Sequence, residues 1–181
     1  VSTSHSGAGG GNGYSSDASL SPDGRYVVFL SNAGDLVMND TNNLTDVFVR
    51  DLVTGATTLV SVGTNGWSAN NAAASPSLSA DGRRVAFQST ANNLAAEDTD
   101  SSYNDVFVRD LATGTTVLAS TNLPGDSLVT THSLPVLSPD GAYVAFWSYS
   151  STPRARVKNL QTGDTTAISV GSSKRPADAR T

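Results

Sequence analysis

The sequence predicts an all-β protein made of three four-stranded antiparallel sheets, and two repeated phrases carry this prediction. The first phrase contains Leu-Ser-x-Asp-Gly followed by an apolar run, and its copies occupy residues 19–31, 77–89 and 136–148. The second reads Asp-Val-Phe-Val-Arg-Asp-Leu-x-Thr-Gly and is degraded in its last copy; the copies occupy residues 46–55, 105–114 and 154–163. Copies of the first phrase lie 58 and 59 residues apart. Regular spacing of this kind indicates one supersecondary unit repeated along the chain.

The first phrase predicts the first two strands of each unit, joined by a tight turn. Pro suits the first central position of a type I turn, Asp bonds its own backbone, and Gly accepts the positive φ that follows. An apolar run of the type Val-Val-Phe or Val-Ala-Phe comes next. We therefore expect an antiparallel hairpin around each Asp-Gly pair.

The second phrase predicts the third strand and the turn into the fourth. The third strands are expected at residues 46–51, 105–110 and 154–159, and the fourth at 57–62, 115–120 and 165–170. The Thr-Gly pair between them fits a tight hairpin. Middle strands with unbroken apolar runs, such as residues 27–30 and 47–49, are typical of sheets covered on both faces.

Together the two phrases resemble the WD40-like β-propeller repeat of TolB-type proteins, from about residue 17 to residue 170. The resemblance implies radially arranged blades, commonly about six or more, that serve mainly for binding and scaffolding. With three repeats the chain is expected to be a partial or half β-propeller. The expected divisions are a Gly/Ser-rich N-terminal segment and inter-blade loop, three blades and a polar tail, at residues 1–16, 17–62, 63–121, 122–170 and 171–181.

The N-terminal segment contains two echoes of the loops between repeats. Residues 1–3 match residues 60–62, so the segment is expected to begin at the tail of an outer strand. Residues 12–15, Asn-Gly-Tyr-Ser, resemble residues 65–68, Asn-Gly-Trp-Ser, which predicts that both occupy the same inter-repeat loop.

Composition limits the classes of protein that the chain resembles. It has no Cys, so a disulfide or a thiolate metal site is excluded. A net charge of −5 argues against a nucleic-acid partner, and no stretch reaches the ~20 apolar residues of a membrane-spanning helix. Loops rich in Ser, Thr and Asn without Cys are compatible with an exported bacterial protein, and we expect an extracellular or periplasmic location.

Three blades predict self-association, because propellers close with roughly 4 to 8 blades. An open arc exposes two apolar blade faces, and such patches mark an interface. The expected partner is the protein itself, either as two arcs that form a six-bladed ring or as a head-to-tail filament. Another propeller fragment, or the rest of a longer chain, is the alternative.

The loop between the second and third strands carries the best signal for a metal. Oxygen-bearing side chains at alternate positions can surround Ca²⁺, which takes about 6 to 8 oxygen ligands. The candidate calcium ligands are Asp40, Asn42, Asp46, Asp98, Asp100 and Asp105. The alternative is that these side chains cap turns through their own hydrogen bonds. The third repeat has Ser150-Ser-Thr-Pro153 at this place and is expected to bind no metal.

A small set of loop residues is predicted to bind a ligand at one end of the blades. The candidates are two aromatic and two polar side chains, Tyr14, Trp67, Asn70 and His132. The alternative is that the aromatic residues fill seams between sheets. No Gly-x-Ser-x-Gly motif occurs, and His5 and His132 are too far apart in sequence for a zinc-type pair, so we expect no enzyme activity.

These observations favour a non-enzymatic, exported β-propeller module that acts as a binding or structural unit and self-associates. The alternatives are a fragment of a larger propeller enzyme or TolB-like transport-associated protein, and a subunit of an extracellular filament.

Overall fold

The computed structural model describes residues 2–7, 9–99, 101–120, 131–149 and 153–168. Blade 1 consists of β1 (Ser15–Leu20), β2 (Tyr26–Ser31), β3 (Asp46–Asp51) and β4 (Thr57–Leu59). Blade 2 consists of β5 (Ala73–Leu78), β6 (Arg84–Ser89), β7 (Asp105–Asp110) and β8 (Thr115–Leu118). Blade 3 consists of β9 (Thr131–Leu137), β10 (Tyr143–Tyr149), β11 (Arg154–Asn159) and β12 (Thr165–Ala167).

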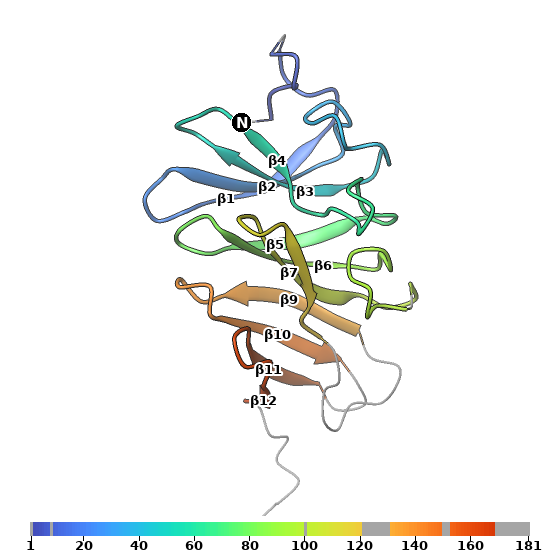
Figure 1. Cartoon of the computed structure of the whole chain (residues 1–181), viewed down its shortest axis with the longest axis vertical. Coiled ribbons are helices and arrows are strands. Elements are labelled where there is room, and N and C mark those ends of the chain that lie inside the picture. Colours follow the sequence, from blue (N-terminus) through green and yellow to red (C-terminus); the bar gives the residue numbers. More distant parts are fainter. Residues whose placement is uncertain (1, 8, 100, 121–130, 150–152, 169–181) are drawn as a thin grey trace, which may run out of the picture.

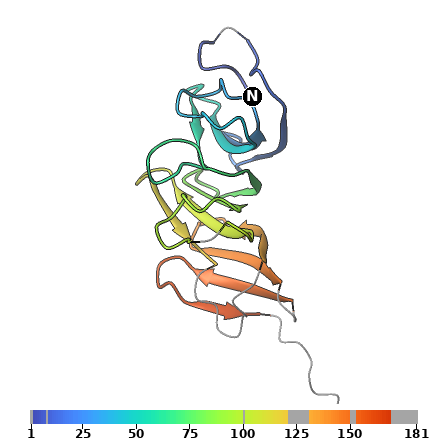
Figure 2. The ribbon, with the colours of Figure 1, turned by 90° about the vertical axis from the view of Figure 1, so that its right-hand side faces the viewer.

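The strands of each blade pair in chain order, and every neighbouring pair is antiparallel. The described residues contain no helix. The three sheets lie one after another along the long axis of the molecule (Figures 1 and 2). The predicted all-β architecture of three four-stranded antiparallel blades is therefore confirmed.

The Asp-Gly turn is held by a hydrogen-bond pattern that explains its fixed Ser and Asp. The Ser21 hydroxyl donates to Asp23 Oδ1 (2.5 Å), and it accepts a bond from the Tyr26 amide (2.9 Å). The Arg25 amide donates to the same Asp23 oxygen (3.0 Å), while Gly24 takes φ +72°. Equivalent bonds recur in the turns of blades 2 and 3. The pattern fixes the hairpin because each of its polar groups is satisfied locally.

The Thr-Gly turn uses the last residue of the third strand as its cap. Asp51 Oδ1 accepts bonds from the amides of Val53 and Thr54, and its other oxygen pairs with Arg25 at 2.9 Å. Blade 2 repeats both contacts through Asp110. In blade 3 the cap is Asn159, which keeps the two amide bonds, and the residue at the arginine position is Ala142. Blade 3 therefore lacks both the Arg and the Asp of the ion pair, but it retains the turn cap.

The fourth strands are shorter than predicted, ending at Leu59, Leu118 and Ala167. In the first two blades a serine beyond the strand turns inward to the start of the third strand. Ser61 accepts a bond from the Val47 amide (3.1 Å) and donates to Asp46 (2.5 Å). This inward turn ends the outer strand.

The core consists of the contacts between consecutive blades. We call the sheet surface that carries Phe87 and Phe107 in blade 2 the front face, and the opposite surface the back face. The front face of blade 2 packs on the back face of blade 1, and the front face of blade 3 packs on the back face of blade 2. The back-face residues of blade 1 are Val28, Leu30, Val47, Val49 and Val60. Coverage on both faces explains the unbroken apolar runs of the middle strands.

The blades approach one another most closely at their first strands. β5 contacts β1, β2 and β3, and β9 contacts β5, β6 and β7. The sheets diverge toward their fourth strands, where hollows open between them. This wedge-like stacking is the arrangement expected of neighbouring propeller blades.

The N-terminal segment has the geometry of an inter-blade connection. Thr3 bridges Gly10 as Val62 bridges Ser68, and the Gly11 amide bonds Ser2 as the Ala69 amide bonds Ser61. The predicted match of residues 1–3 with residues 60–62 is supported at Ser2 and Thr3, whereas Val1 lies outside the described residues. The segment packs over the loop of blade 1, above β1–β4 in Figure 1.

Both segments of the second predicted echo lie in equivalent inter-blade connections, but their residues do not match position by position. Tyr14 bonds the end of β2 through its carbonyl, which accepts from Ser31, and Ala72 does the same for Ser89. Tyr14 therefore corresponds to Ala72, and Trp67 corresponds to Gly9. The Asn-Gly-aromatic-Ser similarity arose from turn-forming residues at different places in the loop.

Candidate functional site

Each seam between blades contains a glycine that receives a side chain of the preceding blade. A Cβ at Gly82 would overlap the ring of Tyr26, and a Cβ at Gly141 would lie 3.1 Å from Arg84 Cδ. Arg84 also donates to the Gly141 carbonyl (2.7 Å). Both glycines have positive φ, at +71° and +67°. Glycine is therefore favoured at these positions both by the turn, which needs positive φ, and by the seam, which has no room for a Cβ.

At the two ends of the stack the same positions have no neighbouring blade. Gly24 is the equivalent glycine in blade 1, and a Cβ there would meet nothing within 4 Å. Leu20 is 60% exposed, although its equivalent Leu137 is 7% exposed. At the other end Tyr143 occupies the position of Tyr26 and is 44% exposed.

The rest of the back face of blade 3 carries further exposed apolar side chains. Trp147 is at the position of buried Leu30, and Ile168 is at the position of buried Val60; they are 41% and 60% exposed. The Trp147 and Tyr149 rings lie 6.4 Å apart. The two open faces thus have the residue positions of a seam and lack the opposing blade.

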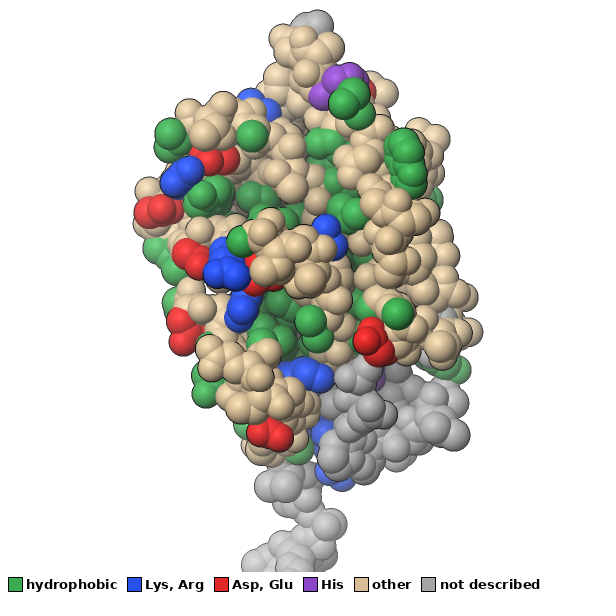
Figure 3. All heavy atoms as spheres, viewed as in Figure 1, with side chains coloured by type: hydrophobic (Ala, Val, Ile, Leu, Met, Phe, Trp, Pro, Cys, Tyr) green, Lys and Arg blue, Asp and Glu red, His purple; other side chains and the backbone are tan. Residues whose placement is uncertain are grey.

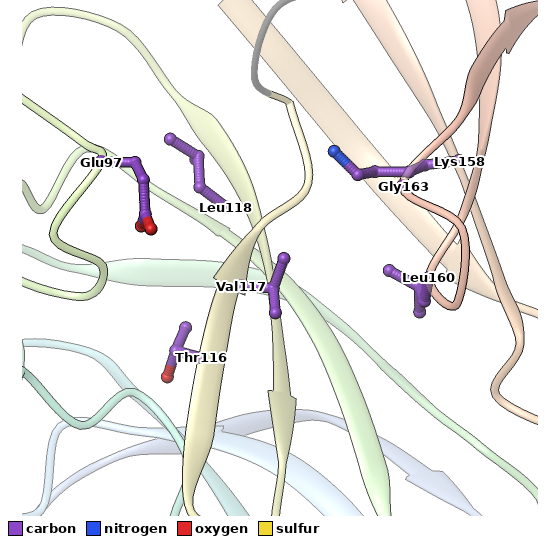
Figure 4. Close-up of a pocket in the computed structure, with 7 residues that line it drawn as sticks. All are labelled: Glu97, Thr116, Val117, Leu118, Lys158, Leu160 and Gly163. Carbon is purple, nitrogen blue, oxygen red and sulfur yellow. The ribbon is translucent and has the colours of Figure 1, made fainter.

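One pocket lies in the seam between blades 2 and 3. It has a volume of about 260 Å³ and is lined by Val117 and Leu118 of β8, Lys158 and Leu160 of blade 3, and Glu97 (Figure 4). Burial lowers the pKa of Lys158, whose side chain faces this hollow.

Two other pockets recur at equivalent places and reflect the repeat. One is lined by the N-terminal segment, Leu36 and the β3–β4 turn, and the other by residues 62–66, Leu94 and the β7–β8 turn. Each also borders the equivalent arginine, Arg50 or Arg109. Acidic and basic side chains are mixed along the edge of the Asp-Gly turns, at the left of Figure 3.

The structure places the predicted ligand-binding residues in separate environments. Tyr14 is 81% exposed and Trp67 is 51% exposed. Asn70 donates to Asn92 Oδ1 (2.7 Å), whereas His132 is buried in the seam with its ring 5.8 Å from that of Phe146. A shared ligand site for them stays a prediction.

The predicted metal ligands differ between the first two blades. Asp40 and Asp46 are buried, and burial raises the pKa of both carboxyl groups, that of Asp46 to about 7. Asn42 caps a turn: its Oδ1 accepts from the Leu44 amide (2.6 Å) and its Nδ2 donates to the Ala69 carbonyl (2.8 Å). In blade 2, Asp98 is buried, Asp105 is half-buried, and Asp100 lies outside the described residues.

Metal binding by these loops stays a prediction. The described residues contain no group of three or more His, Cys, Asp or Glu side chains arranged to hold a metal ion. Ser150, Ser151 and Thr152 of the third repeat are outside the described residues.

Sequence reasoning missed that charged side chains of blade 3 are buried in the seam, and Arg156 is the most buried of them. Arg156 is 1% exposed and occupies the position of Phe48 and Phe107, where the first two blades stack two phenylalanine rings. The sequence does contain a signal for this burial, because the third copy of the second phrase has Arg where the first two copies have Phe. No helix in the described part of the chain has the length and apolar character needed to cross a membrane.

Comparisons with known proteins show the fold. No family model matches the sequence, and no curated protein matches it significantly. Among solved structures, TolB from Acinetobacter baumannii is similar at a TM-score of 0.52 and 16% identity, over 87% of this chain and 33% of that chain. A TolB from Agrobacterium tumefaciens, described as putative, is similar at a TM-score of 0.53 and 16% identity, over 84% and 49% of the two chains.

The β-propeller domain of the Trilobed protease from Pyrococcus furiosus is also similar, at a TM-score of 0.53 and 13% identity, over 85% of this chain and 41% of that one. The chain therefore has the fold of consecutive β-propeller blades, as the TolB-like resemblance implied. It spans a third to a half of the length of these three structures.

Proposed function

We propose that the chain is a non-enzymatic, exported β-propeller module, a binding or structural unit that completes its propeller by association with a second copy. The observation that carries the proposal is that the two open faces have the same types of residue as the faces that meet in the internal seams. The back face of blade 3 presents Tyr143 where blade 1 presents Tyr26. The front face of blade 1 presents Gly24 where blade 2 presents Gly82.

The geometry of the internal seams supports a specific docking of the copies. Tyr143 of one copy fits over Gly24 of the other, as Tyr26 lies over Gly82. Leu20 then gains the cover that Leu137 has in blade 3. Removing such half-exposed apolar side chains from water stabilises an interface by about 25 cal/mol per Å² of buried apolar surface, before the cost of association.

Two such contacts related by a two-fold axis close a ring of six blades, which lies within the range of roughly 4 to 8 found in propellers. A ring of this kind leaves no apolar blade face open to water. A head-to-tail contact that does not close produces a filament instead. The length comparison supports a second candidate, in which the faces dock the remaining blades of a longer propeller protein, such as an enzyme or a TolB-like protein.

The Gly24 contact is tested by a substitution that keeps the turn. Asn tolerates positive φ, so Gly24→Asn retains the hairpin and places a side chain where Tyr143 is expected to dock. Gly66→Asn is the matched control, because Gly66 has φ +85° and a Cβ there would also meet nothing within 4 Å. The measurement is particle mass by light scattering at several protein concentrations.

The expected result is a dimer for the unchanged chain and for Gly66→Asn, and a monomer for Gly24→Asn. A monomeric unchanged chain would overturn the proposal and support the second candidate. Large, polydisperse particles would indicate that the copies form an open filament and not a closed ring. An extracellular or periplasmic location for the assembly is part of the proposal, and the Ser/Thr/Asn-rich loops are compatible with it.

A further inference from the structure

Two buried carboxyl groups in blade 1 have oxygen atoms without a hydrogen-bond partner. Asp40, in the loop between β2 and β3, is 5% exposed, and Asp46, the first residue of β3, is 0% exposed. Both oxygens of Asp40 and Oδ2 of Asp46 have no hydrogen-bond partner. Neither carboxylate forms an ion pair with a Lys or Arg of the described residues.

This arrangement is costly without a positively charged occupant. A buried ionised carboxylate loses several kcal/mol of hydration, which hydrogen bonds, a counter-charge or a metal can offset and which protonation avoids. The negative charge of Asp40 adds to the effect of burial on the pKa of Asp46, so the two groups influence each other directly. The remaining oxygen of Asp46 is used, since Oδ1 accepts from Ser61.

The loop around the pair is held in place by bonds of its backbone and of the Asn42 side chain. Asn42 bonds the Leu44 amide and the Ala69 carbonyl, and the Ser68 hydroxyl accepts from the Thr41 amide (3.1 Å). The Ser68 amide donates to the Asn39 carbonyl (3.0 Å). The backbone on both sides of Asp40 is therefore tied to the next inter-blade connection, and the carboxylates are positioned before any ion binds.

We propose that Asp40 and Asp46 bind one hard divalent cation of the Ca²⁺ class in blade 1. Their carboxylates supply two negative charges and oxygen ligands, and water and backbone carbonyls complete a shell of about 6 to 8 oxygens. Asn42 is a positioning residue, because its amide is already used by the turn. A site with only two carboxylates belongs to the weak class, with dissociation constants of roughly 0.1 to 1 mM.

The other blades differ at these two positions. In blade 2, Asp98 and Asp105 each have an interaction partner, and one more residue separates them. In blade 3, Arg154 pairs with Ser148 as Asp46 pairs with Ser31, so a cation replaces a carboxylate at that position. The proposed site is therefore confined to blade 1.

Calcium titration of thermal unfolding tests the site on the full chain. At a hundredfold excess of Ca²⁺ over the dissociation constant, the unchanged chain is expected to gain roughly 5–10 °C in Tm. Asp40→Asn and Asp46→Asn should abolish the gain, and Asp98→Asn, the matched change in blade 2, should retain it. Calorimetric titration should give a stoichiometry near one Ca²⁺ per chain.

A second comparison separates a ligand role from a structural one. In EDTA, Asp40→Asn should be more stable than the unchanged chain, because it removes a buried unpaired charge; in saturating Ca²⁺ the order should reverse. An unchanged Tm in 10 mM Ca²⁺, or an equal gain in Asp40→Asn, would overturn the proposal. In that case the two carboxyls hold a shared proton instead of a metal ion. Tm should then decrease as the pH rises from 4 to 8, and it should not respond to Ca²⁺.

Discussion

Replacing Gly82 by Ala tests the seam between blades 1 and 2. Gly82 has φ +71°, where an L-residue with a Cβ costs about 1–2 kcal/mol. The added Cβ would also overlap the ring of Tyr26, which has to shift within a packed seam. Overpacking of this kind costs about 1–3 kcal/mol. We therefore expect Gly82→Ala to lower the free energy of unfolding by about 2–5 kcal/mol.

The matched control is Gly163→Ala in the β11–β12 turn. Gly163 has φ +80°, and a Cβ there would meet nothing within 4 Å. It should cost only the conformational part, about 1–2 kcal/mol. For a chain of this length the two changes correspond to losses in Tm of roughly 4–20 °C and roughly 2–8 °C.

A double-mutant cycle in urea unfolding isolates the contact with the ring. When Tyr26 is first replaced by Ala, the additional cost of Gly82→Ala should fall to that of Gly163→Ala. Equal costs for Gly82→Ala in the two backgrounds would refute the reasoning, because they would show that Tyr26 does not occupy the seam above Gly82.

Two further predictions concern one ion pair and one strained residue. Burial opposes ionisation of Asp110, but bonds from Arg83 and from the Thr113 and Ala112 amides outweigh it and lower its pKa to about 2. The Asp110 carboxylate contributes at most about 2 kcal/mol to the free energy of unfolding, and solvent around Arg83 reduces this contribution, which is present above pH 4 and is lost as the pH falls toward 2. Asp110→Asn keeps the turn cap, as Asn159 does in blade 3. The variant should therefore lose less stability than the unchanged chain between pH 4 and pH 2 in urea unfolding. Leu134 has φ +52° at a β-bulge and is 54% exposed, so Leu134→Asn should raise Tm by roughly 2–4 °C; a lower Tm would show that the Leu side chain contributes more than the strain costs.

Repetition made much of the fold predictable. Ser21, Asp23 and Gly24 form a turn through bonds within a few residues, so their pattern indicates a hairpin without knowledge of the rest of the chain. The third strands begin and end where the second phrase placed them, at Asp46–Asp51 and Asp105–Asp110. Their positions follow from the period and from the apolar character of both faces.

The candidate sites were harder to predict because they depend on contacts between distant residues. The sequence singled out Asp40 and Asp46 by spacing, but it did not show that their oxygens are buried without partners. It also did not separate Gly24 from Gly82, since the local motif is the same and only the neighbouring blade differs. His132 illustrates the same limit, because its burial against Phe146 depends on the pairing of β9 with β10.

Disulfide trapping between two single-cysteine variants tests the central proposal most directly. The chain has no Cys, so Gly24→Cys and Tyr143→Cys each contain one thiol. Mixed under mild oxidation, they should form a cross-linked heterodimer faster than either variant forms a homodimer, because the proposed docking places Gly24 of one copy under Tyr143 of the other. Homodimers forming as fast as the heterodimer would contradict the docking of blade 3 of one copy on blade 1 of the next.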